Sequence, residues 1–527
     1  MQFTVNSKYY LSKNGGIVLL SAIFLLCVFI RVYRLEEKPM HVDEAVHAVK
    51  FGYLLENNSY RYNPVEYHGP TLNYFSLIPA WLFGEKNISE VTESTLRIVP
   101  VLSGLILILL LLFLKDFGKE FLLTTFILTG FSSLIVFYNR YYIQESLLVS
   151  FSYSGIILGY KFLKTNKPFL LILSAIFFAL AFASKETFIF TAFAIIVSYF
   201  TLRFINRNSP HVVSVKLNLI IMFAVTFAVT ALLFFTSFFS NPSGAVDSLL
   251  TFTNYFTKAG SNTEHMQPFY YYFTLVSFAN IDGIFFSELI IIIFFVFGLF
   301  RAFLKSNAKS AGIKFIKFIS LMTLILIAVY SAIPYKTPWT MMCFWQGMIL
   351  VAAFGFAEMK KFIPKFNWNI LLAFIAVFLF TQSYFNSIVY SSNPQNPFVY
   401  SHAGEDVKTI EQFLTKVTAV QSKYLSTPIY VAATKSDYWS LPWYLRKFKK
   451  TSWNDRITSD VYKFPIVLAS PELESEVIEK LYSSPPAGKI HLYVPLFDKN
   501  MEIRPGKEMR GYIRKDYFDN YHNALSR

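Results

Sequence analysis

The sequence predicts a polytopic α-helical membrane protein with a carboxyl-terminal α/β domain. Of its 527 residues, 54% are hydrophobic and only 15% are charged. This composition is far more apolar than that of a soluble globular protein. The apolar residues gather into long runs, and a helix needs about 20 such residues to cross a bilayer. The composition changes near residue 390, beyond which helical and strand-like patterns alternate.

Eleven segments have the length and composition expected of membrane spans. They are residues 15–33, 94–114, 120–138, 143–160, 168–184, 187–203, 217–239, 282–300, 315–333, 340–357 and 367–389. The segments 168–184 and 187–203 are the shortest of them. Residues 71–84 are apolar but too short to span, and we expect an interfacial helix there. The first span resembles a signal peptide, but no small-residue cleavage site follows it, so we expect it to be retained.

The distribution of basic residues predicts the orientation of these spans. Lysine and arginine gather in alternate loops, for example at Lys115, Lys119, Lys161, Lys164 and Lys167. Such loops stay on the cytoplasmic side of a membrane, so the amino terminus is predicted to be cytoplasmic and the carboxyl-terminal domain extracytoplasmic. The protein is thus expected in the plasma membrane. Basic loops also explain the net charge of +15 without a nucleic-acid partner.

Two domains follow from this organisation. Residues 1–390 form the transmembrane domain, whose external loop 34–93 carries an acidic motif, and residues 391–527 form the external α/β domain. In the second domain, strands are predicted at Ile429–Ala433, Phe464–Ala469 and Ile490–Val494, and helices at 404–418 and Pro471–Tyr482.

The acidic motif follows the first span. Asp43 and Glu44 begin a predicted helix over residues 43–56. Carboxylates at a helix N-terminus are stabilised by its dipole, so one interpretation is helix capping. The other interpretation is a general base whose pKa is tuned at the membrane surface.

Histidines beside this pair raise the question of a metal. The segment HVDEAVH lacks the histidine, at the place of Asp43, that a zinc-protease motif requires. A weaker site built from His41, Asp43, His47 and His68 remains an alternative. No cofactor is firmly implied, and a divalent metal stays possible.

Further charges lie at span ends on the same predicted side. Arg140 and Glu145 flank one helix end, Lys185 and Glu186 occupy a tight turn, and Lys336 lies between two prolines. Charges so close to hydrocarbon are costly and are usually functional or paired. The structural alternatives are snorkelling of the long side chains and internal pairing of Lys185 with an acidic neighbour.

This one-sided group of cations and carboxylates suits sugar transfer from a lipid phosphate. A departing phosphate develops negative charge, which lysine and arginine stabilise. The attacking hydroxyl needs a base, which a carboxylate supplies, and a single displacement inverts the anomeric centre. A flippase for polyprenyl-linked sugars is the main alternative, although transporters usually place ionisable residues near the bilayer midplane. The third alternative is a membrane-anchored binding protein in which the carboxyl-terminal tail carries the function.

Several motifs resemble those of a known family. They are HVDEAVHA, YHGP, NRYYIQE, SKE, YKTPW, FVYSHAGED and SDYWSLPWYLR. With these motifs the chain resembles the GT-C polytopic glycosyltransferases, in particular the dolichyl-phosphate-mannose protein mannosyltransferase-like (PMT-like) branch, and most closely the archaeal and bacterial "flippase-activity-associated" membrane proteins. The resemblance implies a polyprenyl-phosphate-linked sugar donor and a glycan, lipid or protein hydroxyl acceptor on the outer face. It places the catalytic aspartate at Asp43 and a second acidic residue at Glu145.

The sequence therefore predicts three groups of site residues. The catalytic candidates are Asp43, Glu44 and Glu145, and the candidates for binding the donor phosphate are Arg140, Lys185 and Lys336. The candidates for other substrate contacts are His47, His68, Tyr141, Glu186, Tyr335, Trp339, Trp439 and Trp443. The two tail tryptophans could stack on sugar rings, or they could form a docking surface.

Overall fold

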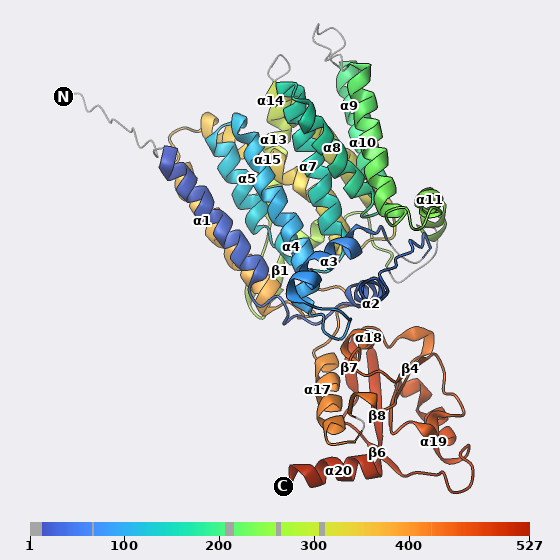
Figure 1. Cartoon of the computed structure of the whole chain (residues 1–527). Coiled ribbons are helices and arrows are strands. Elements are labelled where there is room, and N and C mark those ends of the chain that lie inside the picture. Colours follow the sequence, from blue (N-terminus) through green and yellow to red (C-terminus); the bar gives the residue numbers. More distant parts are fainter. Residues whose placement is uncertain are drawn as a thin grey trace, which may run out of the picture.

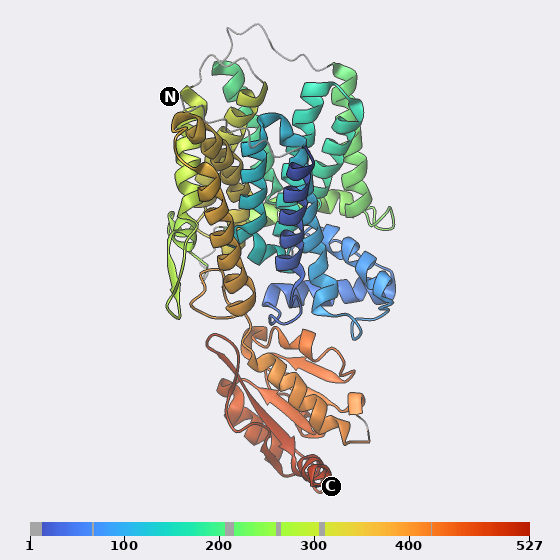
Figure 2. The same ribbon diagram turned by 90° about the vertical axis from the view of Figure 1, so that its left-hand side faces the viewer.

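The computed structural model describes residues 13–65, 68–205, 216–259, 265–304, 311–422 and 424–526. A helical bundle forms one body, and the carboxyl-terminal domain is attached to one end of it (Figures 1 and 2). Helices α2 and α3 lie at that same end, between the bundle and the carboxyl-terminal domain (Figure 1). We call it the site end of the bundle.

The bundle is that of a multi-pass membrane protein. In the described part of the chain, eight helical segments are long and apolar enough to cross a membrane: Gly15–Val32, Glu93–Phe117, Gln144–Thr165, Phe188–Ile205, Leu217–Phe235, Ala311–Ala332, Pro338–Phe362 and Trp368–Val389. A further span is broken, because α5 (Lys119–Phe131) and α6 (Ser133–Asn139) meet at 54°. Two shorter apolar helices are α8 (Pro168–Phe182) and α13 (Leu289–Leu304).

These helices coincide with the eleven predicted segments. The main helices of the eight long segments are α1 (Lys13–Val32), α4 (Glu93–Leu110), α7 (Gln144–Thr165), α9 (Phe188–Ile205), α10 (Leu217–Phe235), α14 (Ala311–Ala332), α15 (Met342–Phe362) and α16 (Trp368–Tyr384). One boundary was wrong. The segment predicted to begin at residue 282 first forms a hairpin of β1 (Ala279–Ile281) and β2 (Ile284–Phe286), and its helix begins at Leu289.

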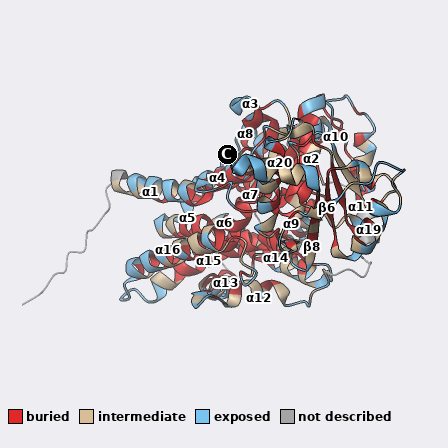
Figure 3. Ribbon diagram, turned by 90° about the horizontal axis from the view of Figure 1, so that it is seen from below, coloured by how far each residue is buried: buried red, intermediate tan, exposed pale blue. Residues whose placement is uncertain are grey.

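Helices α7 and α15 form the centre of the bundle. In each of these helices, 89% of the apolar stretch that could cross the membrane is buried. The buried share is 6% for α10 and 22% for α1 and α9. Figure 3 shows the same division, with buried residues gathered in the middle and exposed residues along the outer helices. Helices α13 and α15 touch through Gly298 and Gly355, where an added Cβ would lie within 2.2 Å of the facing backbone oxygen. Such small residues let membrane helices approach closely.

Two helices at the site end do not span. Helix α2 (Val42–Asn57) matches the helix predicted over 43–56, and α3 (Thr71–Phe83) matches the short helix predicted over 71–84. Helix α3 exposes Trp81, Leu82 and Phe83. An aromatic and apolar surface of this kind suits the boundary between headgroups and hydrocarbon. Helix α11 (Gly244–Ala259) contacts α10, and α12 (Tyr271–Ser277) follows it in the chain.

The carboxyl-terminal domain contains a six-stranded sheet in the order β4-β3-β5-β8-β6, with β7 also paired to β8. Strand β3 is parallel to β4 and β5, whereas β8 is antiparallel to β5, β6 and β7. The strands are β3 (Ile429–Ala432), β4 (Thr451–Asn454), β5 (Ile466–Ala469), β6 (Tyr493–Pro495), β7 (Met501–Arg504) and β8 (Lys507–Arg514). The helices are α17 (Asp406–Ala419), α18 (Leu441–Tyr444), α19 (Glu474–Tyr482) and α20 (Lys515–Leu525).

The predicted α/β domain is therefore confirmed, although half of its strands are absent from the prediction. The two fully buried strands, β3 and β5, were predicted because they are continuous apolar runs. Strands β4, β7 and β8 carry many polar residues and are only partly buried. Their pairing comes from tertiary contacts that a local pattern does not report.

Candidate active site

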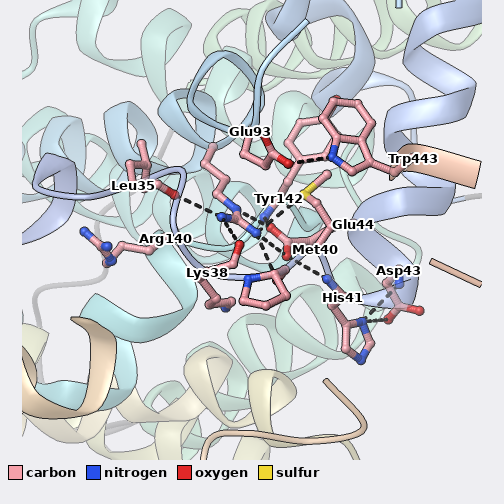
Figure 4. Close-up of polar contacts among 12 residues, drawn as sticks. Leu35, Lys38, Met40, His41, Asp43, Glu44, Glu93, Arg140, Tyr142 and Trp443 are labelled. Atoms are coloured by element: carbon pink, nitrogen blue, oxygen red, sulfur yellow. Dashed lines mark hydrogen bonds and ion pairs between the residues drawn. The ribbon is translucent and has the colours of Figure 1, made fainter. Parts of the chain in front are cut away.

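Glu44 is buried in a network that fixes the start of α2 (Figure 4). Its carboxylate accepts hydrogen bonds from Arg97 Nε at 2.8 Å and Nη2 at 2.9 Å. It also accepts from the backbone N–H of Tyr142 at 2.8 Å and of His41 at 3.0 Å. Burial opposes ionisation, but Arg97 and these hydrogen bonds lower the pKa of Glu44 to about 2. This geometry favours the capping interpretation for Glu44, which forms a capping box with His41.

Arg97 was not assigned a role by sequence reasoning. Its guanidinium is fully buried and, besides Glu44, donates to the carbonyls of Leu35 at 2.9 Å and Lys38 at 2.8 Å. It therefore holds the segment that leads from α1 into α2. The signal in the sequence was an arginine just inside an apolar span, a position that is costly unless the charge is paired.

Asp43, next to Glu44, points elsewhere (Figure 4). Its side chain is 46% exposed, and Oδ2 lies 3.9 Å from His41 Nδ1. Desolvation opposes its ionisation, but His41, His47, His68 and Lys185 outweigh that effect, and the pKa of Asp43 lies below its ordinary value. Asp43 is thus an ionised and accessible carboxylate beside several basic groups.

Glu145 and Lys185 form a buried ion pair near Asp43. Their side chains are only 2% and 7% exposed. Burial raises the pKa of the Tyr335 phenol, and the charges of Asp43 and Glu145 raise it further, whereas Lys185 acts in the opposite direction. A direct contact places the ion pair at the same end of the bundle: Gln144, the residue before Glu145, has its Nε2 3.4 Å from Nδ1 of His47, which lies one turn after Asp43 in α2.

His68 and Glu186 form a second pair. His68 Nδ1 lies 3.0 Å from Glu186 Oε2, and the carboxylate is 7% exposed. Despite burial, His68 and Lys185 lower the pKa of Glu186 to about 2. The ring of His47 lies 6.0 Å from that of His68. Burial, together with the charges of His68 and Lys185, lowers the pKa of His47 to about 3, so His47 is a neutral imidazole.

Two predicted phosphate-binding residues have other contacts. Arg140 Nη1 donates to the carbonyls of Ile30, Arg31 and Tyr33 at 2.8–3.0 Å, at the end of α1. It neutralises the negative end of that helix dipole. Lys336 Nζ donates to the carbonyls of Gln267 at 3.0 Å and Ile333 at 2.5 Å. The contacts of both residues are backbone carbonyls, which favours a structural role for each.

Tyr141 and Trp339 lie in a buried aromatic cluster. The ring of His41 lies 5.4 Å from that of Tyr141 and 5.6 Å from that of Trp339. The amino group of Lys38 sits 4.0 Å from the centre of the Tyr141 ring, a cation–π contact. Tyr141 is completely buried and Trp339 is 5% exposed. Both predicted substrate contacts therefore pack beneath His41.

The two tryptophans of the carboxyl-terminal domain have different surroundings. Trp443 is fully buried, and its Nε1 donates to Glu93 Oε1 at 2.7 Å (Figure 4). The guanidinium of Arg446 stacks on its ring at 3.7 Å. This is a docking contact between the carboxyl-terminal domain and the first residue of α4, as in the alternative given for this motif. Trp439 is half-buried and packs at the edge of the core of the carboxyl-terminal domain.

The alternative of a metal site at His41, Asp43, His47 and His68 is not supported. Across the residues with a described placement, no three histidine, cysteine, aspartate or glutamate side chains are arranged to hold a metal ion. His41 uses both ring nitrogens for other contacts, with Tyr400 and with the backbone of Asp43.

Comparisons with known proteins address the fold. A family model described as dolichyl-phosphate-mannose-protein mannosyltransferase matches residues 68–234. No curated protein matches the chain at a significant level. ArnT from Cupriavidus metallidurans in the apo state has a TM-score of 0.62 and 12% identity, covering 94% of this chain and 98% of its own.

Two further structures give the same result. ArnT from Cupriavidus metallidurans bound to undecaprenyl phosphate has a TM-score of 0.62 and 12% identity, with 95% of this chain and 98% of its own covered. The apo oligosaccharyltransferase of Archaeoglobus fulgidus has a TM-score of 0.54 and 10% identity, with 89% and 71% covered. Identities this low show a shared fold. The chain therefore has the fold of the GT-C membrane glycosyltransferases, and its predicted resemblance to their PMT-like branch is confirmed.

Proposed function

We propose that the chain transfers a sugar from a polyprenyl-phosphate donor to a hydroxyl acceptor at the outer face of the plasma membrane, with inversion at the anomeric carbon. The observation that carries the proposal is that an accessible, ionised Asp43 and the buried Glu145–Lys185 pair lie at the same end of a GT-C bundle. The structure of ArnT with undecaprenyl phosphate supports a lipid phosphate as the leaving group.

Each of these residues has its own role in the proposed reaction. Asp43 accepts the proton of the acceptor hydroxyl while that oxygen forms a bond to the anomeric carbon. The bond from the anomeric carbon to the phosphate oxygen breaks, and its electron pair leaves with the polyprenyl phosphate. Lys185, with His68 beside it, stabilises the negative charge that develops there. Glu145 holds the Lys185 amino group in place, and neutral His47 contributes a polar contact to substrate.

The test is a transfer assay with purified protein in liposomes. Undecaprenyl-phosphate-linked sugars, labelled in the sugar and supplied as a panel, are incubated with an extract of membrane lipids and glycans as acceptors. Release of undecaprenyl phosphate together with a labelled product supports the proposal. If labelled lipid crosses the bilayer and no sugar leaves its phosphate, the transferase proposal fails.

Replacing Lys185 with Met is expected to lower the transfer rate about 10²–10³-fold, because one cationic contact to the departing phosphate is lost. The matched control is Lys164→Met. Lys164 lies at the end of α7 that is opposite to Glu145, and it pairs with Asp116 at 2.8 Å. The control should transfer within about twofold of the wild-type rate, since it lies far from the charge that develops. Equal rates for both variants would remove Lys185 from the mechanism.

A flippase remains the second candidate, because two buried ionisable side chains from other segments contact the break between α5 and α6. Arg31 donates to Gly130 O at 2.8 Å and Thr129 O at 3.2 Å, at the end of α5. Glu288 accepts from Ser132 Oγ at 2.7 Å and from Leu134 N–H at 3.1 Å, at the start of α6. Broken helices with ionisable partners are typical of transporters. These charges, however, satisfy the backbone groups that the break leaves unpaired, which is a structural use of them.

A further inference from the structure

We propose that the carboxyl-terminal domain positions Asp43, through contacts with the two residues that precede its helix. The inference deepens the proposed function and rests on it. It concerns Met40 and His41, which connect the segment held by Arg97 to the first turn of α2. On this proposal the domain is part of the catalytic machinery and is not a detachable module for binding the acceptor.

The first contact is made by Tyr444 of α18. Its hydroxyl accepts a hydrogen bond from the backbone N–H of Met40 at 2.7 Å. Met40 is completely buried, and Tyr444 is 4% exposed. A buried backbone N–H needs a partner, and here the carboxyl-terminal domain supplies it. The backbone three residues before Asp43 is therefore fixed from outside the bundle.

The second contact determines the protonation of His41. Its Nε2 lies 3.0 Å from the carbonyl oxygen of Tyr400, which can only accept a hydrogen bond. In the neutral ring the proton is therefore on Nε2, and Nδ1 is the acceptor. Nδ1 does accept, from the backbone N–H of Asp43 at 3.0 Å. The carbonyl of Tyr400 thus selects the tautomer in which His41 can act as the N-cap of the helix that begins with Asp43.

Burial keeps His41 in that neutral form. The side chain is 5% exposed, and it is enclosed by the rings of Tyr141, Trp339 and His402. The charged groups that act on it are Asp43 and Glu44, which favour its protonated form, and Lys38, which opposes it. Desolvation is the largest influence, and the pKa of His41 lies below its ordinary value.

The domain that makes these contacts is itself firmly docked. Arg446 donates to the carbonyls of Ile88 at 3.2 Å and Val91 at 2.9 Å, and Trp443 donates to Glu93. These three partners lie just before or at the start of α4, the helix that carries Arg97. The carboxyl-terminal domain therefore connects the base of α4 with the start of α2. A shift of the domain would move the Asp43 backbone relative to the bundle.

The test uses two variants that remove one contact each and keep the fold. Tyr444→Phe removes the hydroxyl that Met40 needs. His41→Asn keeps a side-chain acceptor suited to the N-cap position but is too short to reach Tyr400. The matched control is Tyr438→Phe, the same change in the same motif, at a residue whose ring packs on Trp453. Hydrogen–deuterium exchange and transfer kinetics are measured for each in liposomes.

Both test variants should exchange faster at residues 42–47, while exchange in α7 and α15 stays unchanged. They should also lower kcat about tenfold or more with the donor KM unchanged, because the base is displaced and the binding groups are not. Tyr438→Phe should match wild type in both measurements. Faster exchange at Met40 alone, faster exchange throughout the bundle, or an unchanged kcat would each overturn the proposal.

The two readouts separate this inference from the proposed function. If the wild-type protein transfers no sugar from any donor in the panel, the proposed function fails. The exchange experiment still shows whether the carboxyl-terminal domain controls the start of α2. If transfer is found and exchange at residues 42–47 is the same in all variants, only the positioning role fails.

Discussion

Replacing Asp43 with Asn is expected to lower the rate of sugar transfer about 10²–10⁴-fold. The amide has nearly the same shape as the carboxylate, but it cannot take up the proton of the acceptor hydroxyl. Because the side chain is 46% exposed and lies apart from the Glu44–Arg97 network, folding and membrane insertion should not change. Transfer by purified protein in liposomes is measured alongside the midpoint of thermal unfolding.

The matched control for this variant is Asp247→Asn. Asp247 lies in the first turn of α11, so it is also a carboxylate near a helix N-terminus at the site end. Its replacement should leave transfer within about twofold of wild type, since it takes no part in proton transfer. A similar loss in both variants would point to a general effect of charge. Full activity of Asp43→Asn would remove Asp43 as the base.

The pH dependence of transfer gives an independent check on the same residue. The pKa of Asp43 lies below its ordinary value, because desolvation is outweighed by His41, His47, His68 and Lys185, so the carboxylate is mainly ionised above that ordinary value. As the pH falls, the loss of activity caused by protonation of Asp43 should therefore reach its midpoint only below the ordinary pKa of an aspartate. The profile of kcat/KM measures this. A loss with a midpoint near pH 6.5 would instead indicate an imidazole as the base.

The membrane domain could be predicted from sequence because its signal is one of length and polarity. Each span is a run of apolar residues, and the bilayer leaves little other structure open to such a run. The pattern of apolar residues did not predict the break between Phe131 and Ser133, because the helices on both sides of it are apolar. The hairpin at 279–286 was missed for the same reason, since its residues continue into the apolar run of α13.

The candidate site could be predicted as a set of residues at one end of the bundle, but not as a set of contacts. Asp43 and Glu44 are adjacent, and successive residues of a helix point about 100° apart. Glu44 therefore faces Arg97 while Asp43 faces the basic groups. Arg140 and Lys336 lie at the predicted end too, yet their long side chains turn toward backbone carbonyls. That choice depends on neighbours brought by other helices, which local sequence does not specify.

Replacing Arg97 with Met is expected to destabilise the protein by about 3–5 kcal/mol, because it leaves Glu44 as an uncompensated buried charge. The carbonyls of Leu35 and Lys38 would lose their hydrogen-bond donor as well. The free energy of unfolding is measured by denaturant titration in detergent. The control is Arg301→Met, whose arginine is 26% exposed and pairs at 3.4 Å with Glu358, which Lys361 also contacts.

The control should cost about 1 kcal/mol or less, as expected of a partly exposed pair with a second cation. A double variant, Arg97→Met with Glu44→Gln, distinguishes the buried charge from lost packing. Glutamine is neutral and can still accept from the backbone N–H groups of His41 and Tyr142, so the double variant should be more stable than Arg97→Met alone. If Glu44→Gln instead adds its own destabilisation in full, the two side chains do not act as a pair, and Arg97 stabilises the segment before α2 through its carbonyl contacts alone.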